Sequence, residues 1–371
     1  MAKLSYRLNQ SLISTSFLIL ILGLIALISA SAVIGEQKYG DVYYFVKRQL
    51  FFGVFLGLIA FWIVSRIDYH VWKKYSVILL IINIVLLLLC FVPAFQSSSG
   101  VAARRWLAIG PLSFQPSELL KITYILFLAS ILSKASFKQR KRIFGFPFLC
   151  FLISLGVVGL IILKQPATGS LIVLGLSSLA VYLTAGINFT QLLTVVLLGG
   201  LTLYYFIFAN ESSYRLDRFK TFLSSHADPL GKGYHITQSL LGIGSGGLLG
   251  IGFGKSIQKF NYLPESHTDA IFSIIAEEFG FLGSVVIIVL FLILILIGFR
   301  IASRAADEFG KFLAIGLICN IGFQAFINIG AMCGVVPMTG IPLPFISYGG
   351  SSLIINLITI GMLSSIAKRA R

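Results

Sequence analysis

Long apolar runs are the feature that most limits what this 371-residue chain can fold into. A helix needs about 20 apolar residues to cross a bilayer, and runs near that length follow one another. We expect ten spans, with ends at about 12–34, 50–65, 75–95, 119–133, 143–163, 171–185, 192–209, 270–299, 312–335 and 353–367. The second and sixth are short for a full crossing. Because lipid offers a backbone no hydrogen bonds, all ten should be helices, which predicts an all-α polytopic membrane protein.

Composition agrees with a membrane protein. Hydrophobic residues make up 57% of the chain and charged residues 11%, against about 25% charged in soluble domains. The formal charge of +16 comes from short basic clusters between apolar runs, which is typical of membrane topology rather than of a nucleic-acid surface, so we expect no nucleic-acid partner. The four cysteines all fall inside apolar runs without metal-binding spacing, so we expect free thiols.

The first apolar run could be mistaken for a cleaved secretory signal, because Ala30-Ser-Ala32 resembles a cleavage site. A signal core has about 7–15 apolar residues, and this run is longer, so we interpret it as a retained span. Basic residues in alternate loops predict that both termini are cytoplasmic. These clusters are Lys3 and Arg7; Arg66, Lys73 and Lys74; Lys134, Lys138, Arg140, Lys141 and Arg142; Arg300, Arg304 and Lys311; and Lys368, Arg369 and Arg371.

The extracytoplasmic side then carries one large loop, about residues 210–269, between the seventh and eighth spans. It begins with the basic and aromatic stretch Tyr214–Lys220, which suits the headgroup interface. Gly242–Gly247 matches GxGxxG, but no βαβ unit surrounds the match. Mobile or re-entrant backbone is therefore a better interpretation than a dinucleotide site. We treat residues 1–371 as a single membrane domain.

Asp269 ends this loop and directly precedes an apolar stretch. An acid at the mouth of a membrane helix is costly and therefore indicates function, and the helix dipole favours its ionised form. A helix N-cap would explain the same residue equally well. Glu277 and Glu278 follow inside the helix. They indicate a hydrated interior beside Asp269, although a partner on another helix would also satisfy them.

A second group of charges lies before and inside the fourth span. Arg104 and Arg105 precede it, and Glu118 and Lys121 fall three residues apart on one helical face. Glu118 and Lys121 could simply pair and hold the bundle together. Alternatively they line an outward cavity in which Lys121 and the arginines receive an anionic group.

Polar residues and helix breakers mark the ninth span and the segment after it. Asn320, Gln324 and Asn328 form one polar stripe. Hydrogen bonding between helices is the simpler explanation, but the stripe also indicates which face points inward. Gly334–Ser352 follows, with three prolines and repeated glycines. Such a segment cannot be regular helix, and at membrane depth it must be buried in protein or line a cavity.

Five motifs together are specific: Lys47-Arg-Gln49, Ala103-Arg-Arg-Trp106, Phe114-Gln-Pro-Ser-Glu118 with Lys121, Tyr262-Leu-Pro-Glu265 with His267-Thr-Asp269, and Pro342–Ser352. In these motifs, and over nearly its whole length, the chain resembles the SEDS family (shape, elongation, division and sporulation), which includes FtsW, RodA and SpoVE. Three further stretches resemble the division and sporulation members, FtsW above all, more than RodA: Glu36–Asp41, Asp228–Tyr234 and Gln238-Ser-Leu240.

The resemblance implies a ten-helix peptidoglycan glycosyltransferase that polymerises lipid II on the outer face of the bacterial cytoplasmic membrane, at the division septum for an FtsW-like member. By motif, Asp269 corresponds to the family's essential aspartate. Glu118 and Lys121 correspond to a pair facing the same cavity, and Arg48 to a basic position near its mouth. The other cavity candidates are Arg104, Arg105, His267, Gln324, Asn328, Ser347 and Gly349. The family works with a class B penicillin-binding protein, a single-span transpeptidase, and with other divisome proteins.

Two positions depart from the family pattern. Ala167 stands where the family usually has an aspartate, so any metal or hydrogen-bonding role of that acid is lacking here. Ala270 replaces the usual Phe after Asp269, which alters packing but not charge. We assign no metal ligand and no certain cofactor, and the resemblance leaves a divalent cation open.

In the implied reaction Asp269 is the general base for the 4-hydroxyl of the acceptor sugar. The cationic candidates Arg48, Arg104, Arg105 and Lys121 stabilise the charge of the departing lipid diphosphate. Three alternatives stay open: a lipid II flippase, because broken helices and intramembrane charges also suit transporters; a non-catalytic scaffold for the transpeptidase; and a RodA-type elongation polymerase. The gathering of acids on the outer side argues against the flippase.

Overall fold

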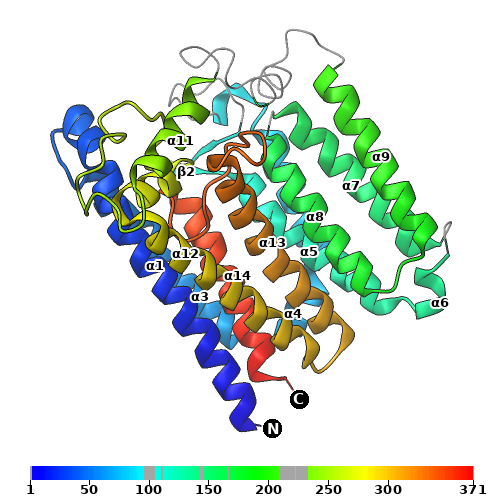
Figure 1. Cartoon of the computed structure of the whole chain (residues 1–371). Coiled ribbons are helices and arrows are strands. Elements are labelled where there is room, and N and C mark those ends of the chain that lie inside the picture. The colour runs from blue at the N-terminus through cyan, green and yellow to red at the C-terminus, as the bar shows by residue number, and fades with distance from the viewer. Residues whose placement is uncertain are drawn as a thin grey trace.

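The computed structural model describes residues 2–95, 105–109, 112–142, 145–165, 167–208, 222 and 233–370. Nearly all of its regular structure is helical, and Figure 1 shows the long helices side by side in one bundle. Both termini lie at the same end, which we call the terminus end; the opposite end is the site end. The expected helical membrane class is confirmed.

The main helices are α1 (Ala2–Tyr39), α2 (Tyr44–Arg48), η1 (Gln49–Phe55), α3 (Leu56–Arg66), α4 (Tyr69–Leu89), α5 (Pro116–Lys134), α7 (Phe146–Lys164), α8 (Thr168–Thr184), α9 (Phe189–Phe208), α11 (Tyr234–Ser245), α12 (Ile271–Ser303), α13 (Glu308–Met332) and α14 (Gly350–Lys368). Among the described residues, eight helices are long and apolar enough to cross a membrane, with α2, η1 and α3 forming one of them. Helix α8 and part of α9 are shorter apolar helices. Each expected span therefore corresponds to a helix, while ten crossings and their orientation remain predictions.

The second span is longer than expected. Its 23 helical residues run from Tyr44 to Arg66, whereas the apolar run begins only at Leu50, because Lys47 and Arg48 interrupt it. Both cations are accommodated at the helix end: Lys47 Nζ lies 2.7 Å from a carboxylate oxygen of Asp41, and Arg48 donates to the Tyr44 hydroxyl at 3.2 Å. The turns from Gln49 to Phe55 are π-helical, a form that is rare and often found at functional sites.

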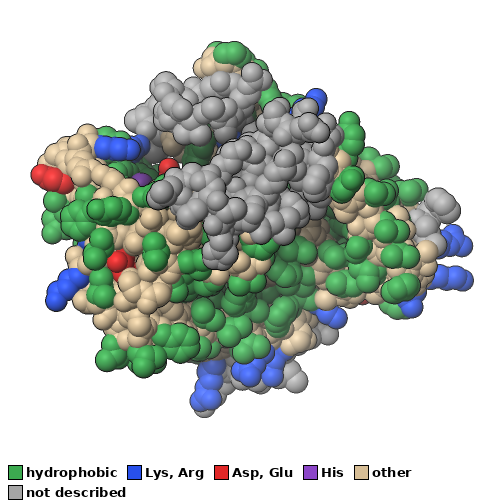
Figure 2. Space-filling model, turned by 45° about the horizontal axis from the view of Figure 1, so that its top comes forward, with side chains coloured by type: hydrophobic (Ala, Val, Ile, Leu, Met, Phe, Trp, Pro, Cys, Tyr) green, Lys and Arg blue, Asp and Glu red, His purple; other side chains and the backbone are tan. Residues whose placement is uncertain are grey.

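Helices α5, α13 and α14 form the centre of the bundle, and most of their residues are buried. Helices α1, α3, α4, α8 and α12 pack around them. Helix α7 and the described part of α9 expose many apolar side chains, as a lipid-facing surface would. Figure 2 shows hydrophobic side chains over the flanks, with Lys and Arg at the lower and right-hand edges and also at the left.

The loops predicted to be cytoplasmic do meet at one end of the bundle, the terminus end. Three contacts join them: Arg369 Nε to Asp68 Oδ2 at 3.1 Å, the Tyr69 hydroxyl to Asp307 Oδ1 at 2.7 Å, and an Arg140–Glu308 ion pair. The short helix α6 (Phe137–Arg140) supplies the last of these. The loops therefore share one side, as the charge pattern requires.

Helix α12 is broken at Gly280, whose φ of 67° and ψ of −164° are non-helical. The glycine-rich run of the preceding loop fills the break through four hydrogen bonds: Ile251 N to Glu277 O, Gly252 N to Glu278 O, Phe281 N to Gly247 O and Leu282 N to Leu248 O, at 2.9–3.2 Å. A Cβ added at Gly250 would lie 2.1 Å from the Glu278 carbonyl oxygen, so this approach requires glycine. The run therefore restores the backbone hydrogen bonds that the break removes.

A small hairpin before α5 was not expected. Strand β1 (Leu107–Ile109) pairs antiparallel with β2 (Leu112–Phe114), with Leu107 opposite Phe114. Three-residue strands are too short for sequence periodicity to reveal. The hairpin contacts the start of α14, because the Ser351 hydroxyl donates to the Ser113 carbonyl at 3.1 Å.

Candidate active site

Asp269 lies at the site end, in the turn that leads into α12, and is partly buried. The N-cap of α12 is Ala270, and it makes no side-chain cap bond. Asp269 therefore directly precedes the N-cap residue of α12. The Asn328 side-chain amide of α13 donates to the Asp269 carbonyl and to the Ile341 carbonyl, each at 2.8 Å. Asn328 thus ties the backbone at Asp269 to the proline-containing segment.

Glu118 and Lys121 form a buried ion pair, with Lys121 Nζ 2.8 Å from Glu118 Oε1 and both side chains at most 3% exposed. The same ammonium donates to Gln324 Oε1 at 2.5 Å, and Gln324 Nε2 donates to the Pro342 carbonyl at 2.9 Å. Pairing is therefore confirmed, and two of the three ammonium donors are directed at these partners. The polar stripe of α13 is buried, and its Gln324 and Asn328 side chains bond to neighbouring segments. For these two residues, both the hydrogen-bonding and the inward-facing interpretation apply.

The segment between α13 and α14, which we call the proline loop (Gly334–Gly349), connects these groups. Its Pro342 and Ile341 carbonyls accept from α13, as above, and the Ser347 hydroxyl accepts from Leu343 N at 2.7 Å inside the loop. At its end, Gln49 Oε1 accepts from Gly349 N at 3.0 Å, and Gln49 Nε2 donates to the Ser347 carbonyl at 3.4 Å. A buried amide thus holds the last turn of the loop from both sides.

His267 joins the proline loop to the Asp269 segment. Its carbonyl accepts from Tyr348 N at 3.0 Å, and its ring lies 4.5 Å from the Phe45 ring and 5.7 Å from the Tyr348 ring, centroid to centroid. Burial lowers the pKa of the His267 imidazole, because a protonated ring loses hydration there. His267 is therefore held as a neutral aromatic partner rather than as a cation.

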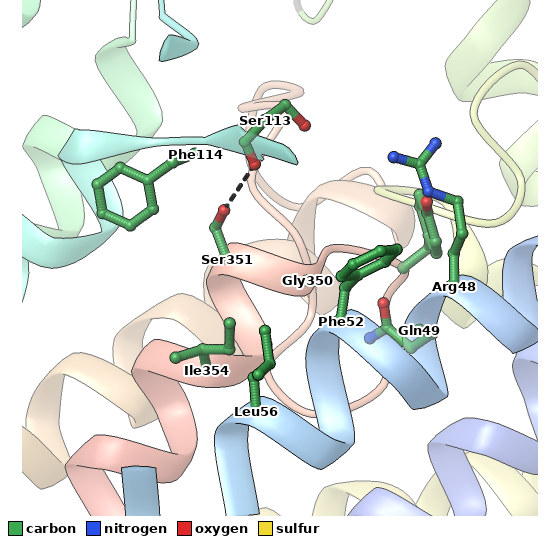
Figure 3. A pocket seen from close by; sticks show the side chains of 10 residues that line it. Arg48, Gln49, Phe52, Leu56, Ser113, Phe114, Gly350, Ser351 and Ile354 are labelled. Carbon is green, nitrogen blue, oxygen red and sulfur yellow. Dashed lines mark hydrogen bonds between the residues drawn. The ribbon is translucent and has the colours of Figure 1, made fainter. Parts of the chain in front are cut away.

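A cavity of about 190 Å³ opens beside this cluster, between η1, the hairpin and the start of α14. Figure 3 shows the Arg48 guanidinium at one side of it and the apolar side chains of Leu56 and Ile354 at the other. Gln49, Phe52 and Tyr348 also line it. The cavity therefore combines a cation with an apolar wall, which suits an anionic group attached to a hydrocarbon.

The remaining arginine candidates are Arg104 and Arg105. Arg104 lies outside the described residues. Arg105 Nε donates to the Gln165 carbonyl at 3.0 Å, at the turn between α7 and α8. Position 167 is an alanine, and among the described residues no group of three or more His, Cys, Asp and Glu could hold a metal ion.

The two acids inside α12 have partners on the preceding loop. Glu277 accepts from Ile257 N at 3.0 Å, and Glu278 pairs with Lys259 at 3.2 Å. The expectation of a hydrated interior beside Asp269 is not needed to explain them, because buried carboxylates with these partners are satisfied within the protein.

The comparisons with known proteins agree with this architecture. Residues 9–371 match the family described as cell cycle protein, FtsW/RodA/SpoVE. The chain belongs to this family. Stage V sporulation protein E of Bacillus subtilis is 40% identical over 368 residues, covering 97% of both chains. A probable peptidoglycan glycosyltransferase FtsW of Geobacter metallireducens is 38% identical over 377 aligned positions, covering 99% of both.

Solved structures of the FtsW/RodA/SpoVE family share the fold. RodA of Thermus thermophilus superposes with a TM-score of 0.70 at 26% identity, covering 97% of both chains. A chain from a peptidoglycan synthase complex, described as coordinating polymerization and crosslinking, superposes with a TM-score of 0.76 at 27% identity, covering 96% of both.

Within the family fold, sequence reasoning missed three buried polar side chains. It gave no role to Gln49, Ser29 or Lys259, although each is buried and hydrogen-bonded at the site end. It also missed the break at Gly280, which looks like any glycine in an apolar run. A lysine in a glycine-rich outer loop, with two acids in the helix that follows, is the one signal that could have found the Lys259 contact.

Proposed function

We propose that the chain is a peptidoglycan glycosyltransferase that polymerises lipid II into glycan strands, with Asp269 as its catalytic base. Several relatives of 38–39% identity carry the name probable peptidoglycan glycosyltransferase FtsW. The observation that carries the site is the single network of hydrogen bonds that runs from the Glu118–Lys121 ion pair through α13 and the proline loop to the backbone of Asp269.

The reaction joins two sugars and releases a lipid diphosphate. The Asp269 carboxylate takes the proton of the acceptor 4-hydroxyl as its oxygen attacks the anomeric carbon of the growing chain. The bond from that carbon to the diphosphate oxygen breaks with inversion, and the electron pair leaves with the diphosphate. Asp269 is thereby protonated, and it returns its proton to solvent before the next cycle.

The departing diphosphate gains charge that the site must stabilise. Arg48 lies at the polar side of a cavity with an apolar wall, so it can hold the diphosphate while the lipid lies along that wall. Glu118 and Gln324 orient the Lys121 ammonium. Lys121 therefore contributes to stabilising the diphosphate as a positive charge that is held in a fixed position.

We infer the membrane side, the cellular location and the partner of the enzyme from its family. We place Asp269 and the cavity on the outer face of the cytoplasmic membrane, with both termini inside, and the enzyme at the division septum. A class B penicillin-binding protein is the expected crosslinking partner, together with other divisome proteins. The similarity to a chain of a peptidoglycan synthase complex supports a transpeptidase partner.

The experiment compares Asp269→Asn with Asp307→Asn in lipid II polymerisation by the purified, detergent-solubilised protein and its partner. Removing a general base lowers the rate by about 100- to 10,000-fold, whereas Asp307 lies at the terminus end and its amide still accepts from Tyr69. Thermal unfolding checks that both variants are folded. Normal polymerisation by a folded Asp269→Asn protein would exclude Asp269 as the base.

A flippase remains the second candidate, because a broken membrane helix such as α12 is typical of transporters. The two functions separate in detergent, where no second leaflet exists. Polymer formed there by the wild type, and lost in Asp269→Asn, supports the transferase. Lipid II movement across vesicles without any polymer would support the flippase.

A further inference from the structure

Two acids that the proposed chemistry does not use lie at the break in α12. Glu277 is 1% exposed and Glu278 is 2% exposed, and a buried carboxylate is costly unless it is paired or hydrogen-bonded. Glu277 accepts from the backbone N–H of Ile257 at 3.0 Å and of Gln258 at 3.4 Å, and from the Ser256 hydroxyl. It therefore holds three consecutive residues of the preceding loop.

Glu278 binds two other parts of the chain at one oxygen. Its Oε1 lies 3.2 Å from Lys259 Nζ and accepts from the Ser29 hydroxyl of α1 at 2.5 Å. The Lys259 ammonium also donates to Ser29 Oγ at 3.0 Å and to the Gly254 carbonyl at 2.6 Å. Helix α1, the loop and the first half of α12 thus meet at one buried ion pair.

The ion pair closes a short loop of chain that contains Asp269. The segment leaves the ion pair at Lys259 and returns to the same half-helix at Ile271, only twelve residues later. Inside it, Asn261 and Glu265 have positive φ values of 66° and 52°, which non-glycine residues adopt at a cost. Such backbone persists only where its surroundings hold it, and here both ends of the segment are held by one half-helix.

We infer that Glu277, Glu278 and Lys259 are positioning residues for Asp269, an inference that rests on the proposed function. They fix the half-helix 271–279 and the segment 259–270 as one unit, and the break at Gly280 separates this unit from the long membrane helix. Asp269 is then placed by the buried ion pair at one side and by the Asn328 contact to its carbonyl at the other. Neither acid touches substrate.

The test measures kcat and KM for lipid II polymerisation by the full chain with its partner. Glu278→Gln keeps the shape of the side chain but leaves the Lys259 charge unpaired, so the unit shifts. We expect kcat to fall about ten-fold or more with KM within about three-fold, because a small misplacement of a catalytic group costs rate rather than binding. The matched control is Glu308→Gln, which makes the same change in the ion pair with Arg140 at the terminus end.

Glu308→Gln is expected to retain wild-type kcat, even where it lowers the unfolding temperature. Wild-type kcat in folded Glu278→Gln, or an equal loss in Glu308→Gln, would overturn the inference. If Glu278→Gln does not fold, Ser29→Ala is tested instead, because this variant removes the contact with α1 and keeps the Glu278–Lys259 ion pair. A kcat at least three-fold lower in Ser29→Ala supports the inference. An unchanged kcat overturns it. Asp269→Asn runs alongside. If that variant is inactive while these are normal, only the inference fails; if Asp269→Asn is active, the assignment of Asp269 as the base fails instead.

Discussion

The two ends of the bundle use charged and polar side chains in different ways. At the terminus end, ion pairs such as Arg369–Asp68 are partly exposed, with 34% and 43% of the side chains accessible, and they join short loops between regular helices. At the site end, the Lys47–Asp41 pair is exposed as well, but the Glu118–Lys121 pair is almost fully buried, and the buried polar groups hold irregular backbone. The comparison teaches that charge at the site end fixes the shape of loops, whereas charge at the terminus end mainly marks a water-exposed surface.

The largest difference between the ends should appear when one acid of each pair is neutralised. Glu118→Gln leaves Lys121 charged and buried, which we expect to cost about 3–5 kcal/mol of unfolding free energy. Asp68→Asn removes a partly exposed pair with Arg369, which we expect to cost about 1 kcal/mol or less, since the amide can still accept from His70 N as a helix cap. Unfolding in detergent measures both. Equal costs would break the comparison.

Two buried glutamines offer a closer match. Gln49 holds the proline loop at the site end, and Gln191 holds the loop before α7 at the terminus end by donating to the Arg140 and Arg142 carbonyls at 2.9 and 3.1 Å. Truncation to Ala should cost each about 1–3 kcal/mol of stability, because backbone groups lose their partner. Only Gln49→Ala should also slow lipid II polymerisation. A rate loss of the same size in Gln191→Ala would show that the effect is general instability.

The smallest effect concerns His267. Its pKa is lowered by burial in the folded protein, so between that lowered value and the ordinary 6.5 the unfolded chain binds more protons and stability rises with pH. We expect the unfolding temperature of the wild type to fall as the pH is lowered below 6.5. The fall should be smaller in His267→Phe, which keeps the ring contacts with Phe45 and Tyr348. Identical pH profiles for the two proteins would contradict this assignment.

The sequence predicted the helices well because apolar runs of membrane length have few alternative structures. Helical spacing also predicted that Glu118 and Lys121 share one face and that Gln324 and Asn328 share another, and the structure joins the two faces through the bond from Lys121 to Gln324. It could not show that the proline loop links them, because the loop acts through the Ile341 and Pro342 carbonyls, and every residue has a carbonyl. The roles of Asp269 and the cationic candidates remain predictions.

The sequence did not predict the outer turns of the second span, for a different reason. Lys47 and Arg48 lower the local hydropathy, so the apolar run seems to begin after them. The broken start of α12 was hidden because Gly280 leaves the hydropathy of its run unchanged. The break depends on hydrogen bonds with the separate glycine-rich run, which no local pattern shows, whereas the start of the second span depends on the contact of Lys47 with nearby Asp41.

The π-helical turns between Gln49 and Phe55 affect how the second span is rotated relative to α14, which runs parallel to it. Gln49 contacts Gly349, Gly53 faces Leu353, and Gly57 faces Leu357, so the second span and α14 advance together in steps of four residues. One residue fewer in η1 would rotate everything before it by about 100°. The Arg48 guanidinium would then leave the cavity while every side chain below it stayed in place, so the length of this turn itself encodes where the cation points.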